Sequence, residues 1–180
     1  MKHTTVVIAI MFLCSVLNAE TPSTTLPGTQ PAAPKTKDVQ VNGVKLTVPE
    51  GWVIDQSKKY GVPLVLKHPQ ISDNGINVTF IVMDATEKMP VEQFKEKIRD
   101  LASKRNLTVK EDREMQVGAF PQGYYALLEN EVGGDRLFQA VYYAQFEGKF
   151  LMAVCTAKGD GYSECQGEFE KIIKTIQQAK

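Results

Sequence analysis

The sequence predicts an α+β domain with a largely antiparallel sheet and helices on both faces of that sheet, an α/β/α sandwich. Three observations support this fold class: strand-like alternation of apolar residues, two segments with helical periodicity, and a pair of strands that is apolar on both sides. A strand pair of this kind lies in the middle of a sheet, between covering layers. The chain has 180 residues, of which 43% are hydrophobic and 23% charged, and this suffices for one such domain.

Residues 1–19 are typical of a cleavable signal peptide. Lys2 provides a basic start, residues 6–17 form an apolar run, and Ala19 is a small residue at the expected cleavage point. The run is shorter than the roughly 20 apolar residues that a membrane-spanning helix needs. Lipidation at Cys14 is the less favoured alternative, because the residue before this cysteine is large. We therefore expect an exported protein, periplasmic or extracellular, without a membrane span after cleavage.

Residues 20–37 are rich in proline and threonine and contain almost no side chain that could contribute to a core. This composition predicts a disordered linker. Its proline pattern is too weak to predict a ligand of a proline-binding module. The folded domain is expected to span residues 38–180.

The first element of this domain is expected to be a hairpin. Asn42-Gly43 accepts the positive φ angles of a tight two-residue turn. Pairing Val41 with Val44 and Val39 with Leu46 then puts all four apolar side chains on one face. Three short strands are expected next, at residues 52–54, 63–67 and 76–83.

The first helix is predicted from Pro90 onward, because proline suits a first helical turn. Val91, Phe94, Ile98 and Leu101 recur at spacings of three and four and would form one buried face. Four strands should follow, at residues 107–115, 123–131, 137–146 and 150–157. The third and fourth of these strands are apolar on both faces and should lie at the sheet centre.

The second helix is predicted near the carboxyl terminus. Ser163 and Gln166 fit a capping box, in which the two side chains satisfy backbone N–H groups of the first turn. The apolar residues that follow at helical spacing extend this helix to near Lys180.

Two cysteines remain after cleavage of the leader, Cys155 near the end of the last strand and Cys165 in the first turn of the second helix. An even count in an oxidising compartment favours a disulfide between them. Two reduced thiols are one alternative. The other is a redox site, in which the helix terminus would lower the pKa of the Cys165 thiol.

Catalytic, cofactor-binding and metal-binding residues are not predicted. His68 is the single histidine of the expected mature chain, and its place after an apolar strand favours a strand-end residue over a general base. One histidine and two cysteines are too few for a zinc site. The 21 basic and 21 acidic residues balance, which argues against nucleic acid or an anionic membrane as the partner. Several aromatic residues could line a pocket, although core packing is their commoner role: Trp52, Tyr60, Tyr124, Tyr125, Tyr142 and Tyr143.

Three short motifs, together with the order of strands and helices, resemble the PsbP-like superfamily, which includes DcrB-type bacterial envelope proteins and the Mog-type fold. These motifs are Val48-Pro49-Glu50-Gly51-Trp52, Gly123-Tyr124-Tyr125 and Glu147-Gly148-Lys149-Phe150. The resemblance covers about residues 38–180. It implies an α/β/α sandwich without a shared enzymatic site that serves as an accessory or binding protein.

Two functions follow as hypotheses. The favoured one is a non-catalytic accessory domain of the cell envelope that binds another protein. The other is a carrier of a small ligand or lipid in a cleft between sheet and helix. A partner is expected to dock on the polar loops at 56–61, 70–75 and 130–136, where the first candidates are Lys58, Lys59, Tyr60 and Arg136.

Overall fold

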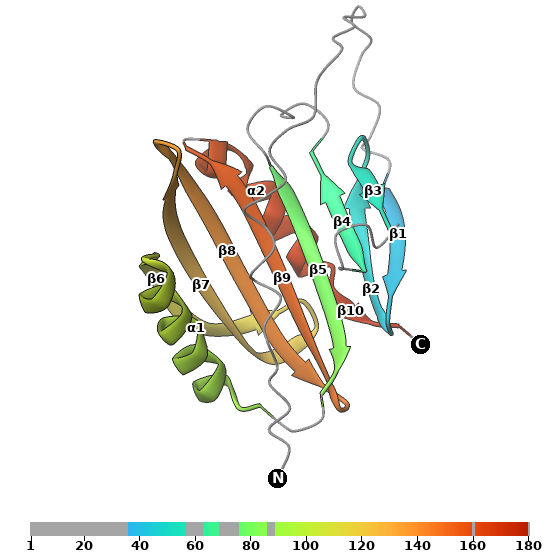
Figure 1. Ribbon diagram of the computed structural model, residues 1–180. Helices are drawn as coiled ribbons and strands as arrows, with labels where there is room; N and C mark the ends of the chain where they lie inside the picture. Colours follow the sequence, from blue (N-terminus) through green and yellow to red (C-terminus); the bar gives the residue numbers. More distant parts are fainter. Residues whose placement is uncertain (1–35, 57–62, 69–75, 86–88, 160, 180) are drawn as a thin grey trace, which may run out of the picture. The chain divides into compact units, whose positions relative to one another are not determined.

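A computed structural model of the protein describes residues 36–56, 63–68, 76–85, 89–159 and 161–179. The chain divides into the units Met1–Pro31 and Ala32–Lys180, and every described residue belongs to the second. That unit is α+β, with two antiparallel sheets and two helices (Figure 1). The signal peptide predicted at 1–19 and nearly all of the linker predicted at 20–37 lie outside the described residues.

The larger sheet has seven strands in the order β3-β4-β5-β9-β8-β7-β6, and every neighbouring pair is antiparallel. Its strands are β3 (Val53–Asp55), β4 (Leu64–Lys67), β5 (Asn77–Asp84), β6 (Thr108–Val117), β7 (Phe120–Val132), β8 (Asp135–Phe146) and β9 (Lys149–Lys158). All seven were predicted from the sequence. β8 and β9 lie near the middle of the sheet, as their two apolar faces require.

The smaller sheet has the order β1-β2-β10, built from β1 (Thr36–Val41), β2 (Val44–Pro49) and β10 (Gln177–Gln178). The predicted register is confirmed, since Val41 pairs with Val44 and Val39 with Leu46 around a turn at Asn42 and Gly43, which both have positive φ. All four valine and leucine side chains are buried. β1 begins slightly earlier than expected, inside the segment predicted as linker.

Helix α1 (Val91–Arg105) packs on β6 and β7. Its buried side chains are Phe94, Ile98 and Ala102, and the Phe94 ring stacks on Tyr143 with centroids 3.9 Å apart. The helix ends at Asn106, whose left-handed conformation directs its backbone N–H to Ala102 and Ser103.

Helix α2 (Gly161–Lys174) differs from the prediction at both ends. It begins at Gly161, so Ser163 lies inside the first turn and is not the N-cap. The early start buries Tyr162, whose hydroxyl lies 3.3 Å from that of Tyr125 in β7. The helix ends at Lys174, before Lys180, because the chain then turns to add β10 to the edge of β2.

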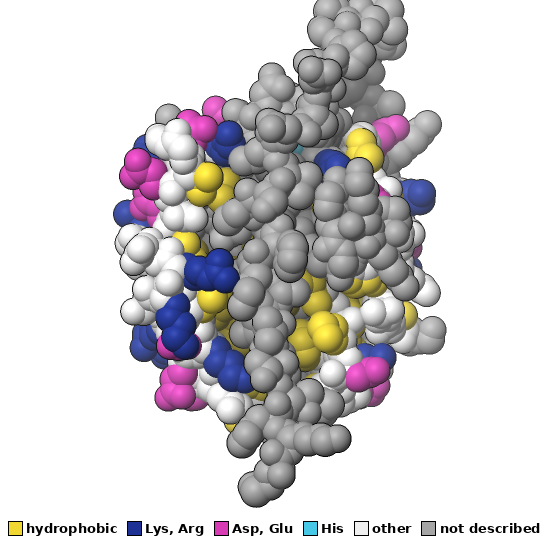
Figure 2. All heavy atoms as spheres, in the orientation of Figure 1, with side chains coloured by type: hydrophobic (Ala, Val, Ile, Leu, Met, Phe, Trp, Pro, Cys, Tyr) yellow, Lys and Arg dark blue, Asp and Glu magenta, His cyan; other side chains and the backbone are white. Residues whose placement is uncertain are grey.

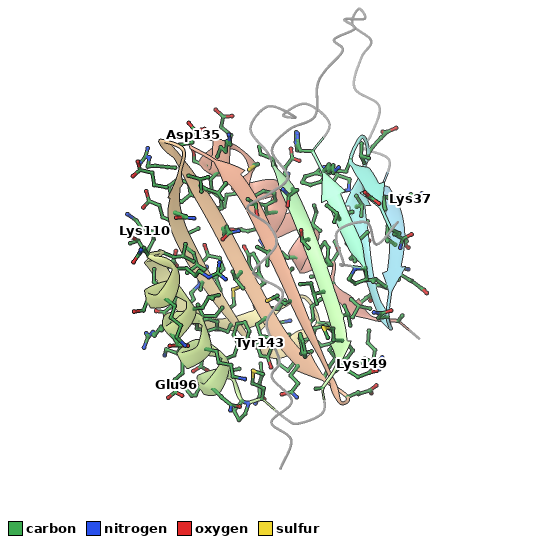
Figure 3. The ribbon with its side chains drawn as sticks, viewed as in Figure 1. Lys37, Glu96, Lys110, Asp135, Tyr143 and Lys149 are labelled. Carbon is green, nitrogen blue, oxygen red and sulfur yellow. The ribbon has the colours of Figure 1, made fainter. Side chains whose placement is uncertain are left out.

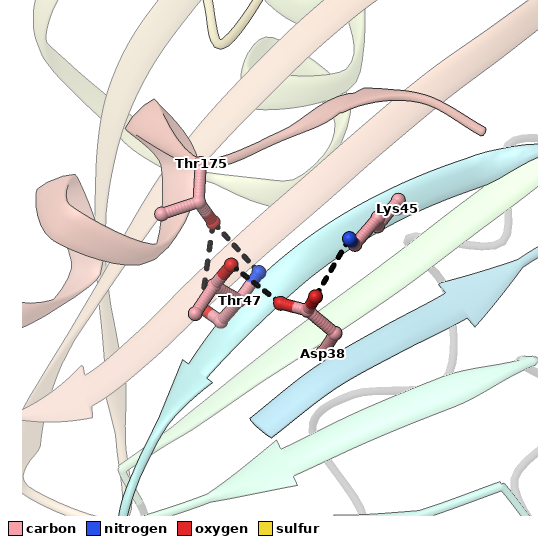
Figure 4. Close-up of polar contacts among 4 residues, drawn as sticks. All are labelled: Asp38, Lys45, Thr47 and Thr175. Atoms are coloured by element: carbon pink, nitrogen blue, oxygen red, sulfur yellow. Dashed lines mark hydrogen bonds and ion pairs between the residues drawn. The ribbon is translucent and has the colours of Figure 1, made fainter. Parts of the chain in front are cut away.

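The end of α2 is joined to the smaller sheet by Thr175 (Figure 4). The Thr47 backbone N–H donates to the Thr175 hydroxyl oxygen at 2.9 Å, and that hydroxyl lies 3.3 Å from the Thr47 carbonyl oxygen. On the outer side of β2, Lys45 pairs with Asp38 at 2.6 Å and the Thr47 hydroxyl donates to the same carboxylate. These bonds fix α2 against the hairpin.

The two helices meet the larger sheet through consecutive residues of β7. Tyr124 contacts Phe94 of α1, and Tyr125 contacts Tyr162 of α2. Consecutive side chains of a strand point to opposite faces of the sheet. The main core lies between the smaller sheet, α2 and the Tyr125 side of the larger sheet.

Candidate functional site

One of the four residues predicted as a partner surface can be placed. Arg136 lies at the start of β8, and 59% of its side chain is exposed. Lys58, Lys59 and Tyr60 lie outside the described residues. Of the four predicted contact residues, the structure therefore describes the surroundings of Arg136.

Arg136 belongs to a charged surface beside the β7–β8 turn, which we call the hairpin surface: Lys110, Glu129, Asp135, Arg136 and Phe138. The Glu129 carboxylate pairs with Lys110 at 3.0 Å and with Arg136 at 3.9 Å. The Arg136 guanidinium also lies over the Phe138 ring, 5.9 Å from its centroid. Figure 3 labels Lys110 and Asp135 in this region, and Figure 2 shows basic and acidic side chains interspersed there.

The backbone holds the hairpin surface in place. Gly133 and Gly134 both have positive φ, which makes the tight turn between β7 and β8. The Gly159 N–H donates to the Arg136 carbonyl oxygen at 2.7 Å, and Lys158 pairs with Asp135 at 3.0 Å. These bonds tie the start of β8 to the end of β9. The exposed Arg136 therefore lies on a strand that is hydrogen-bonded to its neighbour.

The disulfide predicted between Cys155 and Cys165 is not present in the structure, where both residues are free and buried. Cys155 points from β9 into the core, whereas the Cys165 thiol donates to the Gly161 carbonyl oxygen of its own helix at 2.8 Å. The early start of α2 provides that acceptor. The thiol of Cys165 is therefore directed along the helix.

The burial of both thiols argues against the alternative redox interpretation. Burial raises the pKa of the Cys165 thiol to about 12, and burial likewise raises the pKa of Cys155 well above its usual value. A redox cysteine needs the opposite direction, because the thiolate is the reactive form.

His68 follows β4, as expected, and its side chain is only 8% exposed. Its Nε2 lies 3.2 Å from the Glu168 carboxylate of α2, and the Trp52 indole N–H donates to the same oxygen at 3.2 Å. The Trp52 and His68 rings meet edge to face at 5.1 Å. This cluster links β4 to α2, and its geometry fits a strand-end residue held in place by packing.

A cleft of about 400 Å³ lies between α2 and β6, and we call it the α2–β6 cleft. Its charged residues are Arg113 of β6 and Glu170 and Lys174 of α2. Its apolar residues are Met115 and Ile173, and Gln116 and Gly118 also line it.

Tyr142 of β8 also lines this cleft, and its side chain is 3% exposed. Burial is the main cause that raises the pKa of the Tyr142 hydroxyl. The nearby charge of Glu170 raises this pKa as well, whereas that of Arg113 lowers it. The hydroxyl is thus a neutral donor near both charges.

Ion pairs already hold the charged residues of the cleft. Arg113 pairs with Glu111, and its guanidinium lies 4.4 Å from the centroid of the Tyr125 ring. Glu170 accepts a hydrogen bond from Gln166 at 3.2 Å and pairs with Lys174 at 3.7 Å. These contacts gather the charged side chains at the rim of the cleft.

The sequence did not predict this cleft. Of its lining residues, Tyr142 alone was among the aromatic pocket candidates, and Tyr124, Tyr125 and Tyr143 are buried in packing contacts instead. The charged residues come from β6 and α2, which are far apart in the chain. No local pattern marks them as one site.

Within the described residues, no group of three or more His, Cys, Asp or Glu side chains could hold a metal ion. No helix in the same part of the chain is long and apolar enough to cross a membrane.

No protein-family model matches the sequence, and no curated protein matches it significantly. Solved structures do match its fold. Cyanobacterial PsbP (CyanoP) from Synechocystis sp. PCC 6803 superposes with a TM-score of 0.62 at 12% identity, covering 86% of this chain and 98% of that one.

Two further structures have a TM-score of 0.52. The Saccharomyces cerevisiae Ran-binding protein Mog1p is 10% identical, and the match covers 81% of this chain and 96% of that one. LpqN, involved in cell envelope biogenesis of Mycobacterium tuberculosis, is 14% identical over 81% and 92% of the two chains. The predicted resemblance is confirmed at the level of fold: the protein has the fold of the PsbP-like/Mog1 superfamily.

Proposed function

From this PsbP-like/Mog1 fold, we propose that the protein is exported and acts in the cell envelope as a non-catalytic accessory domain that binds another protein. Residues 1–19 would be removed as a signal peptide, and residues 20–37 would serve as a spacer. The two helices would cover opposite faces of the larger sheet. In support, one protein of the same fold is involved in cell envelope biogenesis and another binds Ran.

The observation that carries the proposal is the hairpin surface. It exposes an arginine beside an aromatic ring and places basic and acidic groups within one short stretch of surface. Arginine and aromatic side chains dominate the energetics of protein interfaces. Complementary charges around them select the partner and speed its approach.

The experiment replaces Arg136 by Ala and compares the variant with Arg105→Ala, which removes an exposed arginine from the last turn of α1. Each protein is produced in its native envelope and crosslinked, and bound proteins are identified by mass spectrometry. We expect Arg136→Ala to lose the stoichiometric partner that the control retains, since a central interface arginine contributes about 2 kcal/mol or more to binding. Both variants must unfold at the same temperature.

Equal partner recovery in both variants would reject the hairpin surface. Measurable turnover of ester, peptide or phosphate substrates by the purified protein would reject the non-catalytic part of the proposal.

A carrier of a small ligand is the second candidate, and the α2–β6 cleft favours it. The cleft lies between the sheet and a helix, and its volume falls within the range of small-molecule sites, about 300–1,000 Å³. A ligand that copurifies and is detected by native mass spectrometry would support this function.

A further inference from the structure

The Tyr142 hydroxyl at the α2–β6 cleft has no hydrogen-bond acceptor among the described residues. Tyr142 is 3% exposed and lines the cleft, and no hydrogen bond joins its hydroxyl to another described residue. The hydroxyl oxygen is not fully buried, so it is accessible from the cleft. A hydroxyl that faces a cleft in this way is suited to bind a ligand acceptor.

Two basic residues stand at the same cleft. Arg113 pairs with Glu111, and Lys174 pairs with Glu170. A guanidinium has five N–H donors and an ammonium has three, so each base retains donors for a second acceptor. The Glu170 carboxylate also accepts a hydrogen bond from Gln166 at 3.2 Å.

Met115 and Ile173 form the apolar part of the lining. Ile173 is 2% exposed and Met115 packs against the core, so their surfaces toward the cleft form an apolar wall. Beside them the Gly118 backbone lies close to Ile176, and a side chain at this position would collide with the Ile176 carbonyl oxygen. This apolar wall is suited to contact a hydrocarbon or aromatic group of a ligand. It offers no hydrogen-bond partner to a polar group.

We infer that the α2–β6 cleft binds a small carboxylic acid with an apolar body. The carboxylate accepts the hydrogen bond of the Tyr142 hydroxyl and pairs with Arg113 and Lys174. The apolar body lies on Met115 and Ile173. Hydrogen bonds between ionised partners are about twice as strong as neutral ones, which favours the acid over a neutral analogue.

This inference rests on the second candidate function and names its ligand class. It does not depend on a protein partner at the hairpin surface, because the two sites share no residue.

The test uses three probes that share one apolar body: 3-phenylpropionate, 3-phenylpropionamide and 3-phenylpropylamine. Each is titrated into isotope-labelled protein, and the backbone amide signals of Gly118 and Ile173 are followed by NMR. We expect the acid to shift these signals saturably. The amide should bind about tenfold more weakly, since it lacks the charge-assisted bonds, and the amine should be weaker still.

Two variants locate the binding site. Tyr142→Phe keeps the ring and removes only the unpartnered hydroxyl, and we expect affinity for 3-phenylpropionate to fall about fivefold to tenfold. Lys174→Met should weaken binding, whereas Lys171→Met, at an exposed position on the same helix, should leave it unchanged. Unchanged thermal unfolding of each variant shows that the cleft remains folded.

Equal affinity of the acid and the amide would overturn the carboxylate inference and leave a carrier of neutral ligands. Failure of all three probes to shift the cleft signals at millimolar concentration would reject the carrier function as well. Equal binding by Tyr142→Phe and the unaltered protein would remove the tyrosine from the site and overturn the geometry.

Discussion

The two helices stabilise the fold to different degrees. α1 buries Phe94, Ile98 and Ala102 and packs mainly on β6 and β7 at one end of the larger sheet. α2 buries five side chains and contacts both β9 of the larger sheet and β2 of the smaller one. Its carboxyl end continues into β10, and the Ile176 carbonyl accepts the Ala119 N–H at 2.7 Å. α2 therefore joins the two sheets, whereas α1 covers one of them.

The largest expected effect of this difference is on stability. Phe169→Ala should lower the free energy of unfolding by about 4–5 kcal/mol, because Phe169 is fully buried among Trp52 and Tyr162 in the shared core. Phe94→Ala should cost about 3 kcal/mol, since Phe94 packs against one sheet only. Urea denaturation of both variants measures the two values. A Phe94→Ala cost equal to or above that of Phe169→Ala would contradict the comparison.

Thiol labelling tests the same difference without a mutation. Burial raises the pKa of Cys165 to about 12, so much less thiolate forms at neutral pH than for an exposed cysteine. Cys165 in α2 and Cys155 in β9 should therefore react only when the core opens. We expect two protected thiols in the folded mature protein and two titratable thiols after unfolding in urea.

Rapid labelling of Cys165 in the folded protein would show that α2 opens locally and would weaken its role as the shared element. Fewer than two titratable thiols in unfolded protein from the native envelope would restore the predicted disulfide.

The smallest expected effect is on the stability of the protein at low pH, through Asp112 beside α1. The Asp112 carboxylate accepts hydrogen bonds from the Tyr124 hydroxyl and from Arg99, both at 2.8 Å, and these lower its pKa. A carboxylate whose pKa is lower in the folded state stabilises the protein above its unfolded pKa, about 3.9. That contribution is lost as the pH falls through the folded value.

Asp112→Asn should therefore cost less than about 1 kcal/mol at pH 7 and should reduce the loss of stability below pH 4. Urea denaturation between pH 2 and pH 7 measures both changes. Asp38 provides the control. Its pKa is lowered by hydrogen bonds from Lys45 and Thr47, but its side chain is 54% exposed, so Asp38→Asn should change the loss of stability in acid less. An equal effect of both variants would show that burial beside α1 does not strengthen the Asp112 contacts.

The sequence predicted the fold best where local chemistry determines geometry. The hairpin register followed from Asn42-Gly43, because a two-residue turn leaves one pairing that puts every valine on one face. α1 followed from its spacing because a single buried stripe specifies it.

The prediction failed where distant contacts determine an end or a site. Apolar spacing continues through Ile176, yet the helix stops earlier because β10 pairs with β2, a contact that helical periodicity cannot reveal. α2 begins earlier than predicted, and this early start places Tyr162 in contact with Tyr125 of β7. The cysteines were correctly placed on their elements, but the acceptor at Gly161 that orients the Cys165 thiol appears only with the true helix start. The α2–β6 cleft likewise combines residues from separate segments.

The most direct test of the central claim, that a protein partner binds the hairpin surface, is site-specific photocrosslinking in the native envelope. A photoreactive residue is placed at Asp135, which is 62% exposed beside Arg136, and in a second protein at Glu96, an exposed position on α1 (Figure 3). The account predicts one major crosslinked protein from position 135 and none from position 96, and the Arg136→Ala substitution should abolish that product. The same crosslinked proteins from both positions, or none from position 135, would contradict the account.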